Sequence, residues 1–198
     1  MIALRPRSHA ALAACLFLLG MGASPAGAAA NLIVNGGFSG GNSGFSSGYT
    51  YVNSCGEYGA YMIAHSPFAV CAGWADIGDH TTGTGKMMIV DGATAPNIAF
   101  WSEDVAVSPG TEYVLKFWGT SVDPVSYTKP SPRIQVYING QPVGRPLTLP
   151  PHYDGQWHEA AIRWSSDGNT TATISLVDLK QNWDGNDFVI DDISLRVF

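Results

Sequence analysis

The C-terminal stretch "DFVIDDISLRV", residues 187–197, decides the fold class. Apolar and polar residues alternate from Ile193 to Val197, as they do along a β-strand with one buried face. Similar runs, bounded by Gly, Pro, Asn and Asp, recur along the chain, whereas helical periodicity is hard to find beyond the N-terminus. The sequence therefore predicts an all-β protein.

The turn residues between these runs suggest how the strands connect. Pro109-Gly110 predicts a turn, and Asn139-Gly140 and Asp167-Gly168 predict hairpins, because a positive φ is cheap at Asn, Asp and Gly. About eight strands joined by long connections favour a two-sheet antiparallel jelly-roll β-sandwich. The expected strands are "LIVN", "KMMIVDG", "IAFWSEDVAV", "EYVLKFWGTS", "RIQVYING", "WHEAAIRWSS", "TATISLVDL" and "DFVIDDISLRV".

Two segments are expected to be irregular. Residues 36–59 are rich in Gly, Ser, Asn and Tyr without a lasting period, and "DPVSYTKPSP", residues 123–132, carries three prolines that exclude a central strand. Neither an internal repeat nor a linker is visible. We expect residues 30–198 to form one domain.

The N-terminus resembles a secretory signal peptide. Arg5 and Arg7 precede an apolar run and a small-residue segment, which predicts a leader over residues 1–29 and a secreted, extracellular or periplasmic product. The apolar run is too short to span a bilayer comfortably, and no second one follows, so no membrane span is expected.

Charge narrows the range of partners. Removing the two leader arginines takes the formal net charge from −6 to −8. An acidic chain of this kind argues against nucleic acid and anionic lipid, because both require a basic face.

Two cysteines remain beyond the leader, Cys55 and Cys71. In an oxidising compartment they can close one disulfide loop, which would stabilise the fold by roughly 3 kcal/mol. The alternative is a pair of free, buried thiols.

Motifs of catalysis are missing from the sequence. It contains no G-x-S-x-G, no H-E-x-x-H and no phosphate-binding glycine loop, so the expected protein is not an enzyme. A paired-carboxylate glycosidase stays conceivable, but Glu112 and Glu159 read as surface residues. His80, in the turn "GDHTTGTG", is expected to bond backbone through its ring.

The acidic run "NWDGNDFVIDDISL" points to a cation. Neighbouring strand residues face opposite sides, so either Asp191 or Asp192 should face inward, where an unpaired carboxylate is costly. Calcium would satisfy it outside cells. The alternative is a carboxylate satisfied by backbone N–H groups at a strand end.

The order of three motifs resembles a known superfamily. "NLIVNGGF", "VSPGTEYVLKFW" and "FVIDDISL" together resemble galactose-binding-like jelly rolls, notably carbohydrate-binding modules of bacterial xylanases and cellulases. "GDHTTGTGKMMIVDG", with "DGQWHEAAIRW" and "DFVIDDISL", also resembles MAM domains, which are extracellular adhesion modules. The resemblance covers nearly the whole mature chain and implies a two-sheet sandwich.

The resemblance also implies a structural calcium between the first and last strands. The family places a Glu after N-G-x-F, where this chain has Ser39, so we expect Asp79 of the D-H-T turn to replace it. The candidate ligands are Asp191, Asp192 and Asp79, with backbone from Asn35 to Gly37.

Sugar binding requires aromatic faces flanked by polar groups. Trp118, Trp157 and Trp164 lie in alternating strands, where core packing is the commoner use. The expected ligand-binding residues are Trp74, Trp101, Tyr58, Tyr127, Tyr153 and Trp183.

The function expected from these features is a secreted, non-catalytic carbohydrate-binding module that binds a polysaccharide or glycan. Two alternatives stay open. One is an adhesion or matrix module that binds an extracellular protein. The other is a small polysaccharide-degrading lyase or hydrolase on the same scaffold.

Overall fold

The computed structural model describes residues 29–198, except residues 94, 125–129 and 183–184. Apart from Ala29, the expected leader therefore lies outside the described residues. The elements are β1 (Thr50–Tyr51), β2 (Ala60–Ala64), α1 (Pro67–Val70), β3 (Met87–Asp91), β4 (Ala99–Ala106), β5 (Glu112–Ser121), β6 (Arg133–Ile138), β7 (Gln141–Thr148), β8 (His158–Ser165), β9 (Thr171–Asp178) and β10 (Phe188–Val197).

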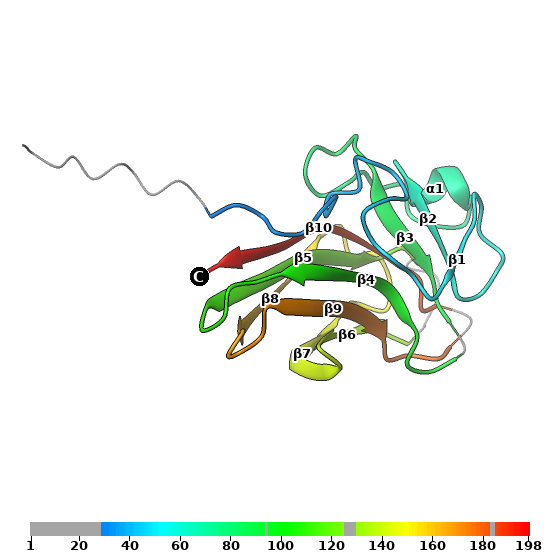
Figure 1. Ribbon diagram of the computed structural model, residues 1–198. Coiled ribbons are helices and arrows are strands. Elements are labelled where there is room, and N and C mark those ends of the chain that lie inside the picture. The colour runs from blue at the N-terminus through cyan, green and yellow to red at the C-terminus, as the bar shows by residue number, and fades with distance from the viewer. Residues whose placement is uncertain (1–28, 94, 125–129, 183–184) are drawn as a thin grey trace, which may run out of the picture.

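The strands form two stacked sheets (Figure 1). One sheet has the strand order β1-β2-β3-β10-β5-β8, and the other has the order β4-β9-β6-β7. Every strand pair is antiparallel except the short β1–β2 pair. The predicted jelly-roll β-sandwich is therefore confirmed.

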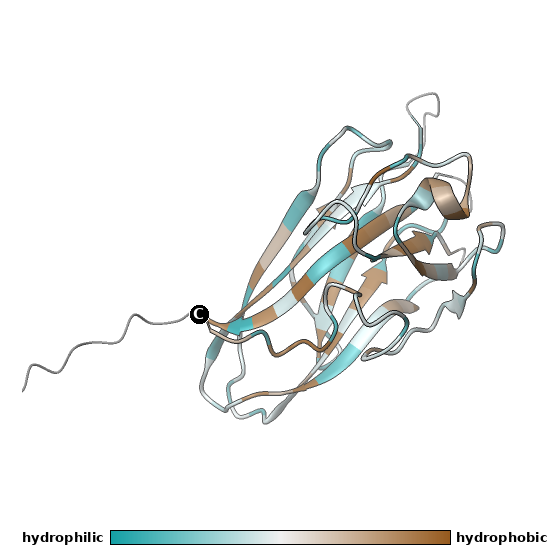
Figure 2. Cartoon of the chain, turned by 90° about the horizontal axis from the view of Figure 1, so that it is seen from above, coloured by the Kyte–Doolittle hydropathy of each residue, from teal (hydrophilic) through white to brown (hydrophobic). Residues whose placement is uncertain are grey.

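The main core lies between the two sheets. On β5, Tyr113, Leu115 and Phe117 are buried, while Glu112 and Lys116 are exposed on the opposite face. The same alternation of apolar and polar residues is visible along several strands in Figure 2. This one-sided burial is why the period-two pattern in the sequence predicts these strands correctly.

A second apolar cluster covers part of the outer face of the six-stranded sheet. Met62, Met87, Ile89 and Val189 point away from the main core and pack beneath loop residues that include Ile77. All five residues of β3 are buried for this reason. The loop that contains the D-H-T turn is thus a packed layer on the sheet.

The structure contains three strands that the sequence did not predict, and it lacks one strand that the sequence predicted. β1, β2 and β7 were not predicted, and "LIVN" is not a strand. β7 contains Pro142 and Pro146, which an edge strand tolerates. The 31–34 segment instead runs beside β10, where Leu32 N donates to Leu195 O at 2.9 Å and Leu195 N donates to the Asn31 side chain.

The two predicted hairpins have different outcomes. Asn139-Gly140, with φ of 51° and 75°, joins the paired strands β6 and β7 and is confirmed. Asp167-Gly168 also turns the chain, but it joins β8 and β9, which belong to different sheets. That hairpin prediction is wrong, because a turn dipeptide sets a chain reversal and the sandwich topology decides which strands pair.

The predicted disulfide is confirmed. Cys55 and Cys71 are bonded, with their Cα atoms 5.4 Å apart, and the bridge ties the loop after β1 to the end of α1.

Candidate functional site

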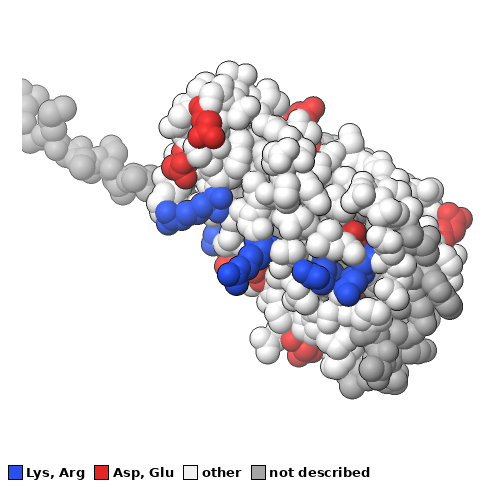
Figure 3. All heavy atoms as spheres, turned by 90° about the horizontal axis from the view of Figure 1, so that it is seen from below, with Lys and Arg blue, Asp and Glu red and all other residues white. Residues whose placement is uncertain are grey.

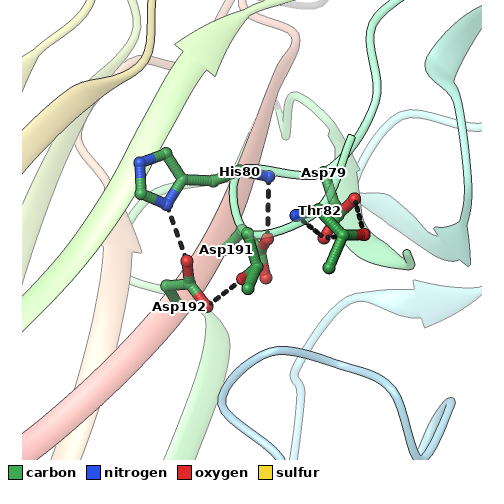
Figure 4. A network of polar contacts seen from close by, with 6 residues as sticks. Asp79, His80, Thr82, Asp191 and Asp192 are labelled. Carbon is green, nitrogen blue, oxygen red and sulfur yellow. Dashed lines mark hydrogen bonds and ion pairs between the residues drawn. The ribbon is translucent and has the colours of Figure 1, made fainter. Parts of the chain in front are cut away.

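The D-H-T turn is held in shape by Asp79. Its carboxylate accepts hydrogen bonds from Thr82 N at 3.0 Å, from Thr82 Oγ1 at 2.9 Å and from Gly85 N at 2.6 Å. Burial alone would raise its pKa, but these donors outweigh burial and hold the pKa of Asp79 below its usual range. Figure 4 shows the carboxylate turned toward Thr82, within its own turn.

The turn is docked onto β10 by the two adjacent aspartates. His80 N donates to Asp191 Oδ2 at 3.0 Å, and His80 Nδ1 lies 2.6 Å from Asp192 Oδ2 (Figure 4). Thr81 Oγ1 donates to Asp192 Oδ1 at 2.6 Å. A register shift in β10 and a φ of 53° at Asp192 bring both carboxylates to the turn, which a regular strand would not do.

Asp191 is the buried member of the pair. Its side chain is covered by the turn on the outer side of the sheet, and its Oδ1 has no hydrogen-bond partner among the described residues. Burial raises the pKa of Asp191 to about 7, and the charges of Asp192 and Asp79 add to the effect. An orphaned, buried carboxylate oxygen is the feature that a cation would satisfy.

The structure brings together part of the expected calcium site. A Cβ added at Gly37 would lie 3.5 Å from Asp192 Oδ1 and 3.9 Å from Asp191 Oδ1, so the backbone there lies against both carboxylates. The candidate ligand atoms are all oxygens, which suits calcium. Within the described residues, however, no group of three His, Cys, Asp or Glu side chains is arranged to hold a metal.

Several of the expected ligands are already engaged. Asp79 uses its oxygens inside its own turn, so its assignment as the replacement for the family Glu is corrected to a turn-stabilising role. The backbone oxygen of Asn35, the expected ligand there, accepts from Phe38 N at 2.9 Å. Of the carboxylate oxygens at this turn, Asp191 Oδ1 alone has no partner among the described residues, whereas both oxygens of Asp192 are engaged by His80 and Thr81.

His80 differs from its expected role. Its ring bonds the Asp192 carboxylate rather than backbone, and it stacks on Trp118 with ring centroids 4.1 Å apart and planes at 16°. The Trp157 ring meets it edge-on at 5.6 Å. Trp118 and Trp157 are half-buried on the outer side of the sheet, so neither fills the main core as expected.

The expected sugar-binding aromatics that the structure describes differ in burial. Trp101 is completely buried in the main core, so its assignment as a ligand residue is corrected. Trp74 and Tyr153 are half-buried against the second apolar cluster, whereas Tyr58 is 55% exposed. Two further candidates, Tyr127 and Trp183, lie outside the described residues.

A pocket that the sequence reasoning missed lies on the outer face of the four-stranded sheet. It has a volume of about 290 Å³ and is centred on half-buried Tyr137, which is opposite Ser175 on the neighbouring strand. The alternation in "RIQVYI" was the available sign, because Ile134, Val136 and Ile138 face the core and place Tyr137 outward. The lining residues are Asn97, Ala99, Tyr137, Gly140, Ser175 and Val177, and none is charged.

The comparisons with known proteins concern the fold. No family model and no curated protein matches the sequence. The TmCBM61 module, solved with beta-1,4-galactotriose, superposes with a TM-score of 0.54 at 17% identity and covers 85% of this chain and 99% of its own. A Stig cyclase from Fischerella sp. TAU has a TM-score of 0.61 at 9% identity and covers 87% and 98%.

A third similar structure is the tandem CBM22 domain of Paenibacillus barcinonensis Xyn10C. Its TM-score is 0.52 at 14% identity, and the match covers 88% of this chain and 48% of the tandem. The chain therefore shares its jelly-roll fold with these structures. The cyclase has this fold too, so the site has to decide the function.

In the described part of the chain, we find no helix that is long and apolar enough to cross a membrane.

Proposed function

We propose that this protein is a secreted, non-catalytic carbohydrate-binding module and that the Tyr137 pocket binds a neutral glycan. The observation that carries the proposal is the composition of that pocket. It combines one aromatic ring with an amide from Asn97 and a hydroxyl from Ser175 in an open hollow of about 290 Å³. An aromatic face with a few fixed polar groups is what a pyranose needs.

The absence of charge in the lining favours a neutral ligand. Tyr137 and Ser175 lie on paired strands of a packed sheet, so the ring and hydroxyl are positioned before ligand arrives. Similar folds that bind sugars, such as the TmCBM61 module with its galactotriose, support the assignment. Binding would involve stacking and hydrogen bonds, without a covalent step.

We further propose a structural calcium at the bulge of β10. Asp191 Oδ1, which has no hydrogen-bond partner among the described residues, would be its first ligand, beside the backbone at Gly37. Asp192 would become a ligand by giving up a bond to His80 or Thr81. The role of the ion would be to fasten the N-terminal segment and the D-H-T turn to the last strand, away from the Tyr137 pocket.

Affinity electrophoresis through soluble beta-1,4-galactan and xylan tests the glycan proposal. We expect retardation of the wild-type protein by one of them. Tyr137→Ala should weaken retention about tenfold, because it removes the stacking face, and Tyr137→Phe should keep most of it. Phe68→Ala, on exposed α1, is the matched control and should bind as wild type.

Two outcomes would contradict the proposal. If the folded protein migrates unchanged in a broad panel of neutral glycans, the adhesion alternative becomes the better reading. If Tyr137→Ala binds as tightly as wild type, the pocket is not the site.

A further inference from the structure

Several basic side chains of this acidic protein lie together on one face of the molecule. Figure 3 shows a band of Lys and Arg across one face. A hollow of about 230 Å³ lies on the outer face of the six-stranded sheet. A second one of about 410 Å³ lies at the edge of the sandwich, between β8 of that sheet and β7 of the four-stranded sheet. Together they are lined by four of the ten basic residues of the chain, namely Lys116, Arg145, Arg163 and Arg196.

The strand register explains why these cations meet. Lys116 on β5 is opposite Ser194 on β10 and Ala161 on β8. Val114, one pleat away, is opposite Arg196 on β10 and Arg163 on β8. Because paired strands are about 4.8 Å apart, the three cations lie on one face within reach of one extended ligand.

Each cation keeps donors available for a ligand. Arg163 lies over the Phe198 ring, with its guanidinium carbon 3.4 Å from the ring centroid, which orients the group without using its N–H donors. Arg196 donates to the Ala29 carbonyl, but a guanidinium carries five N–H donors. Lys116 and Arg163 are exposed.

The groove beside Lys116 also has the features of a sugar site. Trp118 supplies an aromatic side chain there, with one ring face stacked on His80, and Ser194 supplies a hydroxyl. Asn31 also lines the groove, but its amide is bonded to backbone of the N-terminal segment and of β10. Asp192 lies in the same groove, but its two oxygens are engaged by Thr81 and His80. The groove therefore combines an aromatic ring, a hydroxyl and cations.

We propose that this basic groove is a second binding site, which takes anionic glycans carrying a carboxylate or sulfate group on their sugars. It extends from the outer face of the six-stranded sheet to the edge where β8 meets β7, and it shares no lining residue with the Tyr137 pocket on the outer face of the four-stranded sheet. The inference extends the glycan-binding function proposed above to a second ligand class. It does not depend on the Tyr137 pocket.

A polyuronate fits this surface better than nucleic acid does. The formal net charge of the whole chain is −6, which repels a polyanion of high charge density. Duplex DNA carries a charge about every 1.7 Å, whereas a polyuronate carries one charge per sugar. The small groove with a tryptophan suits a single ring.

Glu159 allows a test in which a substitution should strengthen binding of an anionic glycan. Its Oε1 lies 2.7 Å from Lys116 Nζ, and both side chains are partly exposed, so the pair contributes little to stability. An incoming anion competes with this carboxylate for Lys116. Replacing Glu159 by Gln should therefore strengthen binding of an anionic glycan, an effect that a merely structural role would not give.

The experiment measures binding of the full chain to polygalacturonate, dextran sulfate, neutral beta-1,4-galactan and duplex DNA by affinity electrophoresis at two salt concentrations. We expect retention on the first or second polymer that decreases with salt. The difference between these two separates carboxylate from sulfate recognition. Lys116→Gln/Arg163→Gln should weaken retention about tenfold, and Glu159→Gln should strengthen it.

Arg133→Gln on β6 is the control on the other sheet, where it removes one positive charge, half the change made by the double variant. It should bind as wild type, as should Tyr137→Ala on the anionic polymers. Thermal melts of every variant establish that each is folded.

Three outcomes would overturn the inference. They are no salt-sensitive retention on either anionic polymer, equal loss in Arg133→Gln and the double variant, or equally tight binding of DNA. If the protein is retained by galactan but by neither anionic polymer, only the basic groove fails as a binding site and the proposed function survives. Loss of retention on neutral glycans alone would instead remove the proposed function and leave this site standing.

Discussion

Asp191 carries a buried carboxylate oxygen without a partner among the described residues, and this single atom is the strongest support for calcium. If calcium binds there, it stabilises the folded state only, and at about 100 times its dissociation constant the free energy of unfolding rises by about 2.7 kcal/mol. We expect a lower melting temperature in EGTA than in calcium. Asp191→Asn should abolish the difference, and Asp76→Asn, at an exposed turn position, should keep it.

A melting temperature that does not respond to EGTA would have a different physical cause. An unchanged melting temperature in EGTA, with Asp191→Asn more stable than wild type, would show that the carboxylate is an unsatisfied group whose burial costs stability. The proposed calcium site would then be lost.

Asp79 has a different task, because its carboxylate accepts from Thr82 and from Gly85 inside the turn. Asp79→Ala leaves those donors without an acceptor and should lower the free energy of unfolding by about 2 kcal/mol, measured by urea denaturation. Asp76→Ala on the exposed part of the same loop should stay within about 0.5 kcal/mol. A loss of similar size in both variants would contradict the turn-stabilising role.

At the scale of elements, strands with one buried face could be predicted and strands without that asymmetry could not. "EYVLKFWGTS" matches β5 residue for residue, because its alternate positions face the core. β7 was missed, because an edge strand with two prolines has mostly exposed residues and no alternation to detect. β2 was missed because its neighbours on the outer face are loops, which periodicity does not reveal.

The disulfide gives a prediction for the β1–α1 region. The bridge closes a loop with a sequence separation of 16, which constrains the unfolded chain. Cys55→Ser/Cys71→Ser should lower the free energy of unfolding by about 3 kcal/mol. Dithiothreitol should destabilise the wild type by a similar amount and leave the double variant unaffected. Equal stability of the two proteins would mean that the loop is already ordered without its bridge.

At the scale of the whole molecule, the sequence identified the sandwich and the adjacent acids of the last strand, but neither the bulge that turns both of them to the outer side nor the two surfaces proposed for ligands. Asp191 and Asp192 were visible as adjacent acids in one strand. The Tyr137 pocket and the basic groove each combine residues from strands far apart in sequence, such as Lys116 with Arg196. Those combinations depend on strand order and register, which local patterns do not contain.

The end of the sandwich opposite the termini holds a group of buried acids that should make stability depend on pH. Burial raises the pKa of Asp187 to about 8, despite a hydrogen bond from Gly92 N, and the charges of Asp123 and Asp91 add to the effect. Burial likewise raises the pKa of Asp91 to about 6. Both values exceed the ordinary aspartate value of 3.8.

A raised carboxyl pKa means that the folded state holds more protons than the unfolded state between the two values. The free energy of unfolding should therefore fall as pH rises from about 4 through about 8, and then level off. We expect a melting temperature several degrees lower at about pH 9 than at about pH 5, measured in EGTA so that calcium does not contribute. Asp187→Asn should reduce the difference, because the amide keeps an acceptor for Gly92 N without a charge, whereas exposed Asp76→Asn should not. A melting temperature that rises over this range would show that these carboxylates are stabilised in their charged form by the fold.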